Sequence, residues 1–177
     1  MAQLYVAHTA DLDGGTLREM RSLLDAVFGD GFTDYDWEHS LGGMHALVRE
    51  GGDLIGHASV VQRVLLHARR TLRTGYIEGV GVRADRRGRG HGAAMMEALE
   101  RVVRGAYELG ALSAAEAAGG FYMARGWQRW RGATWALTPD GVRRTPEEDG
   151  GIYVLPIAVS LDLSGDLACD WRDGDVW

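Results

Sequence analysis

The chain has 177 residues, of which 46% are hydrophobic, and it carries a formal net charge of −6. This length and composition support one domain with a full core, which we expect to span residues 1–177. No apolar run approaches the roughly 18 residues of a membrane span, and no charged-then-apolar leader is visible, so we expect no membrane partner. The single cysteine, Cys169, cannot form an internal disulfide, which favours a cytoplasmic location.

The first half of the chain alternates between strand and helix patterns. In chain order we predict a strand at 3–9, a helix at 15–28, a short helix at 34–41, a hairpin of strands at 44–50 and 54–66, and a strand at 71–82. Gly51-Gly52-Asp53 forms the hairpin turn, and the turn at 68–70 leads into the last strand. Glycines within 71–82 favour a strand with a bulge over a helix.

The second half begins with an amphipathic pattern over 90–109. Its apolar positions recur at three- and four-residue spacing: Met95, Met96, Leu99, Val102, Val103, Ala106 and Leu109. We then predict a strand at 111–114, a helix at 115–124, and closing strands at 127–137 and 152–161. The order indicates an α/β fold with a mixed, mostly antiparallel sheet flanked by helices.

A glycine-rich loop, Arg87-Gly88-Arg89-Gly90-His91-Gly92, connects the strand that ends at Val82 to the long helix. Glycines let successive backbone N–H groups point at one bound group, and the helix N-terminus adds positive potential. The loop lacks the spacing of a dinucleotide fingerprint and the Gly-Lys-[Ser/Thr] of a Walker loop. It therefore predicts a site for a phosphorylated cofactor, with an Arg/Gly-rich turn that only caps a helix as the alternative.

Charge is distributed unevenly along the chain. We expect Arg83, Arg86, Arg87 and Arg89 to cluster beside the phosphate site, with Asp85 as the only opposing charge. From residue 147 to the end there are eight acidic residues against one arginine. The acidic part disfavours nucleic acid as a partner and suits either a polycation or a solvated tail.

The string Arg87-x-x-Gly90-x-Gly92 resembles the acyl-CoA pyrophosphate loop of the GNAT N-acetyltransferase superfamily. This resemblance implies the GNAT fold, with splayed central strands and acetyl-CoA as co-substrate, and no metal. The pantetheine arm would pair with the backbone at Val80 and Val82. The implied cofactor-binding residues are Val80, Gly81, Val82, Arg87, Gly88, Arg89, Gly90, His91 and Gly92.

Longer segments resemble a narrower family, the aminoglycoside 2′-N-acetyltransferases of actinobacteria. They are the segments at 36–46, 76–80, 103–113 and 169–177, the last of which contains Asp173-Gly174-Asp175-Val176-Trp177. The resemblance covers essentially the whole chain. It implies acetyl transfer to the 2′-amino group of an aminoglycoside by an enzyme that relatives suggest is a homodimer.

By the same resemblance, Glu78 deprotonates the amine through a water and Tyr122 protonates the departing thiolate. Backbone N–H groups near Val80 would polarise the thioester carbonyl. Each side chain also has a structural alternative: Glu78 as a cross-strand charge partner, and Tyr122 as part of a helix core.

The implied substrate-binding residues are Gly31, Asp36, Glu78, Gly79, Ser113, Glu148, Asp175 and Trp177. Relatives commonly carry Asp where this chain has Gly31, so that contact is lost or shifted to Asp30. We expect the Trp177 indole to stack on a sugar ring, and we expect removal of residues 175–177 to leave the melting temperature nearly unchanged.

Six histidines show no metal-ligand spacing, and we expect most of them to be structural. His45 and His57 could face the cleft from paired strands, without an assigned role. Two further functions stay open. One is a GNAT enzyme acting on another amine, such as a cell-wall amino sugar, a polyamine or a protein N-terminus. The other is a non-catalytic acyl-CoA- or drug-binding module, which would tolerate loss of Glu78 and Tyr122.

Overall fold

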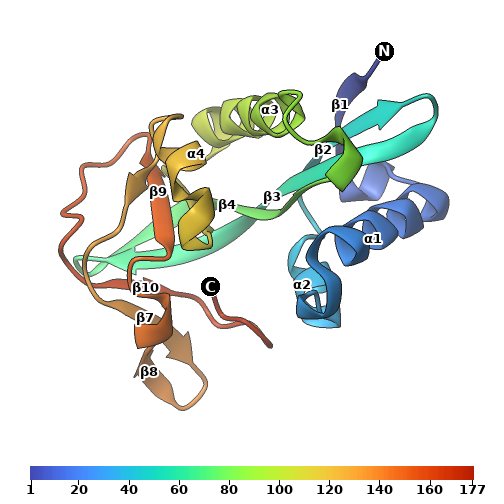
Figure 1. Ribbon diagram of the computed structural model, residues 1–177. Helices are drawn as coiled ribbons and strands as arrows, with labels where there is room; N and C mark the ends of the chain where they lie inside the picture. Colours follow the sequence, from blue (N-terminus) through green and yellow to red (C-terminus); the bar gives the residue numbers. More distant parts are fainter. The chain divides into compact units, whose positions relative to one another are not determined.

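The computed structural model describes residues 1–177, which fall into two compact units (Figure 1). The first unit comprises Met1–Val61 and Ile77–Val102, and the second comprises Gln62–Tyr76 and Val103–Trp177. Two long strands, β3 (Asp53–His67) and β4 (Arg70–Val82), contribute residues to both units.

In the first unit, β1 (Gln3–His8) pairs antiparallel with β2 (Met44–Glu50), which pairs antiparallel with β3. Gly51 and Gly52 form the tight turn between β2 and β3, with φ of 62° and 96°. Glycine adopts these left-handed values without steric cost, so the predicted hairpin is confirmed.

Helices lie on both faces of this sheet (Figure 1). Helix α1 (Gly14–Phe28) and helix α2 (Asp34–His39) share a core with Leu47, while α3 (His91–Ala106) brings Met95 against Gly56, beside Val48. Leu47 packs with α1 and Val48 lies beside Met95 of α3. Because neighbouring strand residues point to opposite faces, α1 and α3 lie on opposite sides of this sheet. Asp13 and Thr33 begin α1 and α2 as hydrogen-bonding N-caps.

The second unit contains a sheet in the order β6-β9-β5-β4-β3-β10-β7-β8. Its further elements are β5 (Leu109–Ser113), α4 (Gly119–Met123), β6 (Gln128–Arg129), β7 (Thr134–Thr138), β8 (Gly141–Arg144), β9 (Ile152–Pro156) and β10 (Leu167–Cys169). β4 pairs parallel with β5 and β10 with β7, whereas β5–β9, β6–β9, β7–β8 and β10–β3 are antiparallel. The predicted mixed, mostly antiparallel sheet is thus confirmed.

The long helix ends earlier than predicted. It stops at Ala106, and Leu109, predicted on its apolar face, instead pairs with Thr74 as the first residue of β5. The N–H of Glu108 already donates to the carbonyl of Arg73 over 3.0 Å. Sheet hydrogen bonds therefore override the helical periodicity at this end.

The strand predicted at 127–137 is also wrong, because it divides into β6 and β7. At Gly132 an added Cβ would lie 1.8 Å from the carbonyl oxygen of Gly165, so the chain turns where only glycine fits. The helix predicted at 115–124 is a 3₁₀ turn (Glu116–Ala118) followed by α4. The strand predicted at 152–161 ends at Pro156, and β8 and β10 were not predicted.

Candidate functional site

The predicted site residues divide between the two units. The first unit holds Gly31, Asp36, Glu78, Gly79, Val80, Gly81, Val82, Arg87, Gly88, Arg89, Gly90, His91 and Gly92. The second holds Ser113, Tyr122, Glu148, Asp175 and Trp177. No group of three or more His, Cys, Asp or Glu residues is placed to hold a metal ion, and no helix is long and apolar enough to cross a membrane.

The glycine loop leaves β4 through a 3₁₀ turn at Ala84–Arg86 and enters α3 at His91. Gly88 and Gly90 have φ of 72° and 82°, and no atom lies within 4 Å of where a Cβ would be. The imidazole Nε2 of His91 is buried without a hydrogen-bond partner. Open glycines followed by the free N–H groups of a helix N-terminus fit a bound anion.

The arginines around this loop differ in their charge balance. Arg83 is paired with Asp53 and Asp85, and Arg86 is paired with Glu50 and Asp85. The prediction of Asp85 as the only opposing charge is therefore wrong, because the β2–β3 hairpin supplies two more carboxylates.

Two loop arginines hydrogen-bond backbone carbonyls instead. The Nε of Arg87 donates to Val82, and Nη2 of Arg89 donates to Asp85. Both side chains are exposed. They retain positive charge that an anionic ligand could neutralise.

The backbone at Glu78 and Gly79 is held by side chains from β3. Nδ1 of His57 lies 2.8 Å from the Gly79 carbonyl oxygen, and Oγ of Ser59 donates to the Glu78 carbonyl over 3.4 Å. Gly79 has φ of 55°, and an added Cβ would lie 3.1 Å from Oγ of Ser40. This left-handed residue confirms a local irregularity in the strand.

Farther along β4, Gly81 has a packing role. An added Cβ there would lie 3.3 Å from Val27 and 3.4 Å from Leu24, both on α1. The side chains of Val80 and Val82 are half-buried.

Two of the four substrate-binding residues expected from the first unit, Asp36 and Gly31, offer few free polar groups. Oδ2 of Asp36 accepts hydrogen bonds of 2.7 Å from both the N–H and the hydroxyl of Thr33, closing the capping box of α2. Gly31 ends an exposed 3₁₀ turn. A Cβ added to this residue would meet open space, with no contact within 4 Å.

In the second unit, Ser113 and Glu148 lie side by side. The hydroxyl of Ser113 donates to Oε2 of Glu148 over 3.2 Å. Burial, followed by the negative charge of Asp175, raises the pKa of Glu148, and the Ser113 hydrogen bond partly opposes the shift. Three of the predicted substrate residues thus form one acidic cluster.

The C-terminal tail is docked rather than frayed. The Trp177 indole is 2% exposed, and its Nε1 donates to Oγ1 of Thr145 over 3.0 Å. Nη2 of the buried Arg63 donates to the carbonyl of Val176 over 2.8 Å, and Oδ1 of Asp175 accepts from the Trp177 N–H. The expectation that the indole stacks on a sugar is wrong, because the ring is buried in the protein.

Tyr122, on α4, is 7% exposed and packs near Phe121, Trp127 and Tyr153. Burial raises the pKa of its hydroxyl to about 12. The side chain therefore carries its proton throughout the neutral range, as a general acid must.

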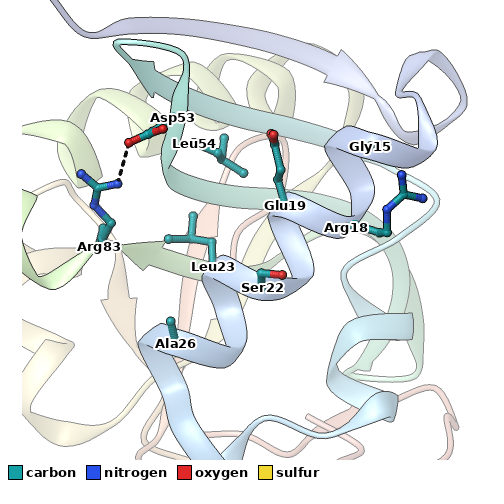
Figure 2. Close-up of a pocket in the computed structure, with 9 residues that line it drawn as sticks. All are labelled: Gly15, Arg18, Glu19, Ser22, Leu23, Ala26, Asp53, Leu54 and Arg83. Atoms are coloured by element: carbon teal, nitrogen blue, oxygen red, sulfur yellow. Dashed lines mark hydrogen bonds and ion pairs between the residues drawn. The ribbon is translucent and has the colours of Figure 1, made fainter.

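A pocket of about 680 Å³ lies between α1 and the β2–β3 turn (Figure 2). Figure 2 shows Glu19 and Arg18 on α1, and Arg83 linked to Asp53 at the opposite side. No predicted site residue lines this pocket. Arg83 belongs to the arginine cluster but is turned toward Asp53 here.

Sequence reasoning assigned no role to His45 and His57, which the structure brings together at 3.0 Å between Nδ1 and Nε2. The sequence indicates this contact only by placing the two histidines on neighbouring strands. In the observed register His57 pairs with Leu47, and Leu47 lies two residues after His45. Thr145 and Arg63, which hold the tail, carried no signal at all.

Comparisons with known proteins agree with this architecture. The model of the acetyltransferase (GNAT) family matches residues 16–127. The aminoglycoside 2′-N-acetyltransferase of Mycolicibacterium fortuitum is 52% identical over 176 residues, covering 97% of this chain and 90% of that enzyme.

Two solved structures share the fold at low identity. A GNAT family acetyltransferase from Brucella melitensis in complex with acetyl-CoA has a TM-score of 0.63 at 15% identity, covering 97% of each chain. An acyl-CoA N-acyltransferase from Pseudomonas aeruginosa also has a TM-score of 0.63, at 17% identity, covering 87% of this chain and 99% of that one. The chain therefore belongs to the GNAT family of acetyltransferases and is, within it, a homologue of the M. fortuitum aminoglycoside 2′-N-acetyltransferase.

Proposed function

We propose that this protein transfers the acetyl group of acetyl-CoA directly to the 2′-amino group of an aminoglycoside. The observation that carries the proposal is the 52% identity to an aminoglycoside 2′-N-acetyltransferase over nearly the full length of both chains. The acidic cluster of Ser113, Glu148 and Asp175 supports a polycationic acceptor, because partly desolvated carboxylates bind ammonium groups strongly.

The glycine loop and the end of β4 would hold acetyl-CoA. The left-handed, unobstructed Gly88 and Gly90 would let backbone N–H groups approach the pyrophosphate, and Arg87 and Arg89 would neutralise its charge. Val80, Gly81 and Val82 would pair with the peptide-like pantetheine arm. Acetyl-CoA supplies an activated thioester, so the protein needs to position the amine and move two protons.

In the proposed reaction Glu78 accepts the proton of the amine through a water, and the nitrogen forms a bond to the thioester carbon. The Val80 N–H stabilises the oxyanion. The C–S bond then breaks, and the Tyr122 hydroxyl protonates the thiolate of CoA. Tyr122 holds this proton at neutral pH, because burial raises the pKa of its hydroxyl to about 12.

Substrate binding would rest on Glu148, Asp175 and Ser113, with Trp177 holding the tail in place rather than stacking on the drug. Asp36 would contribute through the oxygen that the capping box leaves free, and Gly31 and Gly79 through their backbone. This arrangement puts most of the recognition of the drug in the second unit.

We further propose that residues 1–177 act as one acetyltransferase domain, and that the protein is a homodimer in the cytoplasm, where acetyl-CoA is made. The free, buried Cys169 is compatible with a reducing compartment. Light scattering at several concentrations tests the dimer.

A thiol-release assay tests the function. Acetyl-CoA should give free CoA with aminoglycosides that carry a 2′-amine and not with analogues that carry a 2′-hydroxyl. Activity only on other amines would favour another GNAT enzyme. Binding of CoA or drug without turnover would favour a non-catalytic module.

A further inference from the structure

A chain of hydrogen bonds starts at the exposed Gly42 and runs through two buried histidines to the backbone beside Glu78. The N–H of Gly42 donates to Oγ1 of Thr9 over 2.9 Å, and Oγ1 of Thr9 lies 2.7 Å from Nε2 of His45. Nδ1 of His45 lies 3.0 Å from Nε2 of His57, whose Nδ1 lies 2.8 Å from the carbonyl oxygen of Gly79. Both imidazoles are fully buried, and all five residues belong to the first unit.

The direction of each hydrogen bond follows from the Gly79 carbonyl at one end of the chain and from the neutral state of both imidazoles. A carbonyl oxygen only accepts, so Nδ1 of His57 carries a proton. Burial lowers the pKa of His57 to about 4, and burial together with the charges of His57 and His8 lowers that of His45 to about 3. Each ring is therefore neutral at pH 7 and has one acceptor nitrogen. It follows that His45 donates from Nδ1 to His57 and that Nε2 of His45 accepts from the Thr9 hydroxyl. This hydroxyl lies closer to Nε2, at 2.7 Å, than to its other acceptor, the Gly43 carbonyl oxygen, at 3.3 Å.

All donors thus point toward Gly79. The carbonyl of Gly79 and the N–H of Val80 belong to one peptide group, and a hydrogen bond accepted by the carbonyl polarises that group and strengthens its N–H as a donor. A second bond, from Ser59 to the Glu78 carbonyl, fixes the preceding peptide. A side chain at position 79 would crowd both Ser40 and the His57 ring, which explains the glycine.

We propose that His57, supported by His45 and Thr9, is a positioning residue for acetyl transfer that orients and polarises the Gly79–Val80 peptide so that the Val80 N–H binds the developing oxyanion. The role of Val80 rests on the proposed function. The histidines themselves touch neither substrate and exchange no proton in the reaction.

Nuclear magnetic resonance of the unliganded protein tests the chain without any activity. Ring ¹⁵N shifts of the wild type at pH 7 should identify both His45 and His57 as neutral with the proton on Nδ1. In His57→Leu the Val80 amide proton should move upfield, and in His57→Asn it should return toward the wild-type value, because the Asn amide can donate where Nδ1 did. A cationic ring, or His57 protonated on Nε2, would overturn the proposal even if the variants failed to fold.

Kinetics supply the second readout. His57→Leu should lower kcat about tenfold, less than the loss of a whole oxyanion donor, with the KM of both substrates nearly unchanged and partial recovery in His57→Asn. The matched control is His67→Leu, which removes another buried β3 imidazole that contacts a carbonyl, that of Asp166 at 2.8 Å. The control should leave kcat and the Val80 shift unchanged.

The positioning role of His57 and the proposed function can be contradicted separately. A folded His57→Leu protein with wild-type kcat and an unchanged Val80 shift overturns the inference and leaves the proposed function intact. A wild-type protein that does not acetylate a 2′-amine ends the proposed function, and the Val80 shift still decides whether the histidine chain polarises the peptide.

Discussion

Nε1 of Trp177 donates a 3.0 Å hydrogen bond to Oγ1 of Thr145, so the last residue of the chain is part of the core of the second unit. The two residues are 32 positions apart in the sequence. The tail therefore contributes to stability as well as placing the Asp175 carboxylate. This corrects the expectation that removal of residues 175–177 leaves the melting temperature nearly unchanged.

Trp177→Ala should destabilise the protein by about 3–5 kcal/mol, as for other buried large aromatic side chains. Calorimetry should register this as a melting temperature lower by about 6–20 °C, at roughly 2–4 °C per kcal/mol for a chain of this size. The matched control is Trp171→Ala, since Trp171 is 45% exposed and should leave stability nearly unchanged. A Trp177→Ala protein that melts with the wild type would show that the indole is not held as described.

The pKa of Glu148 should respond in opposite directions to its two neighbours. Asp175→Asn removes a negative charge and should lower the raised pKa, whereas Ser113→Ala removes a hydrogen bond to the ionised form and should raise it further. Because an elevated pKa makes the carboxylate protonate earlier on acidification, the KM for the drug should rise as the pH falls toward it. Carboxyl ¹³C titration measures these shifts. Identical titrations in both variants would show that Ser113, Glu148 and Asp175 do not interact.

Tyr122→Phe should lower kcat with little change in either KM, because a proton donor to the leaving group acts mainly in the transition state. The raised pKa means that the neutral hydroxyl is lost only near pH 12, so Tyr122 should produce no alkaline decline of kcat below pH about 10. Steady-state kinetics over this range check both statements. An unchanged kcat in Tyr122→Phe would show that Tyr122 only packs in the core and donates no proton.

Gly90→Val should raise the KM for acetyl-CoA more than tenfold by blocking the approach of the backbone to the pyrophosphate. Gly51→Val is the matched control, since Gly51 also has a left-handed φ, of 62°, with open space around it, but lies in the β2–β3 turn. Both variants carry similar backbone strain, so only the first should alter cofactor binding by calorimetry. Equal effects of the two variants would mean that strain, not contact with a ligand, explains the change.

Local features were the most predictable from the sequence. Hydrophobic spacing predicted α1 and α3, and glycines predicted the β2–β3 turn and the loop before α3, because each depends on residues close together in the chain. The short strands β8 and β10 and the docking of Trp177 depend on partners far away in sequence. The pairing of His45 with His57 depends on strand register, which alternation alone does not specify.

The most direct test of the account is the structure of the reaction product. The purified enzyme is incubated with acetyl-CoA and an aminoglycoside that bears a 2′-amine among several other amines, and the product is analysed by mass spectrometry and NMR. We predict one added acetyl group, on the 2′ nitrogen, with one CoA released for each. Acetylation at another nitrogen, or equal turnover of an analogue with a 2′-hydroxyl, would contradict it.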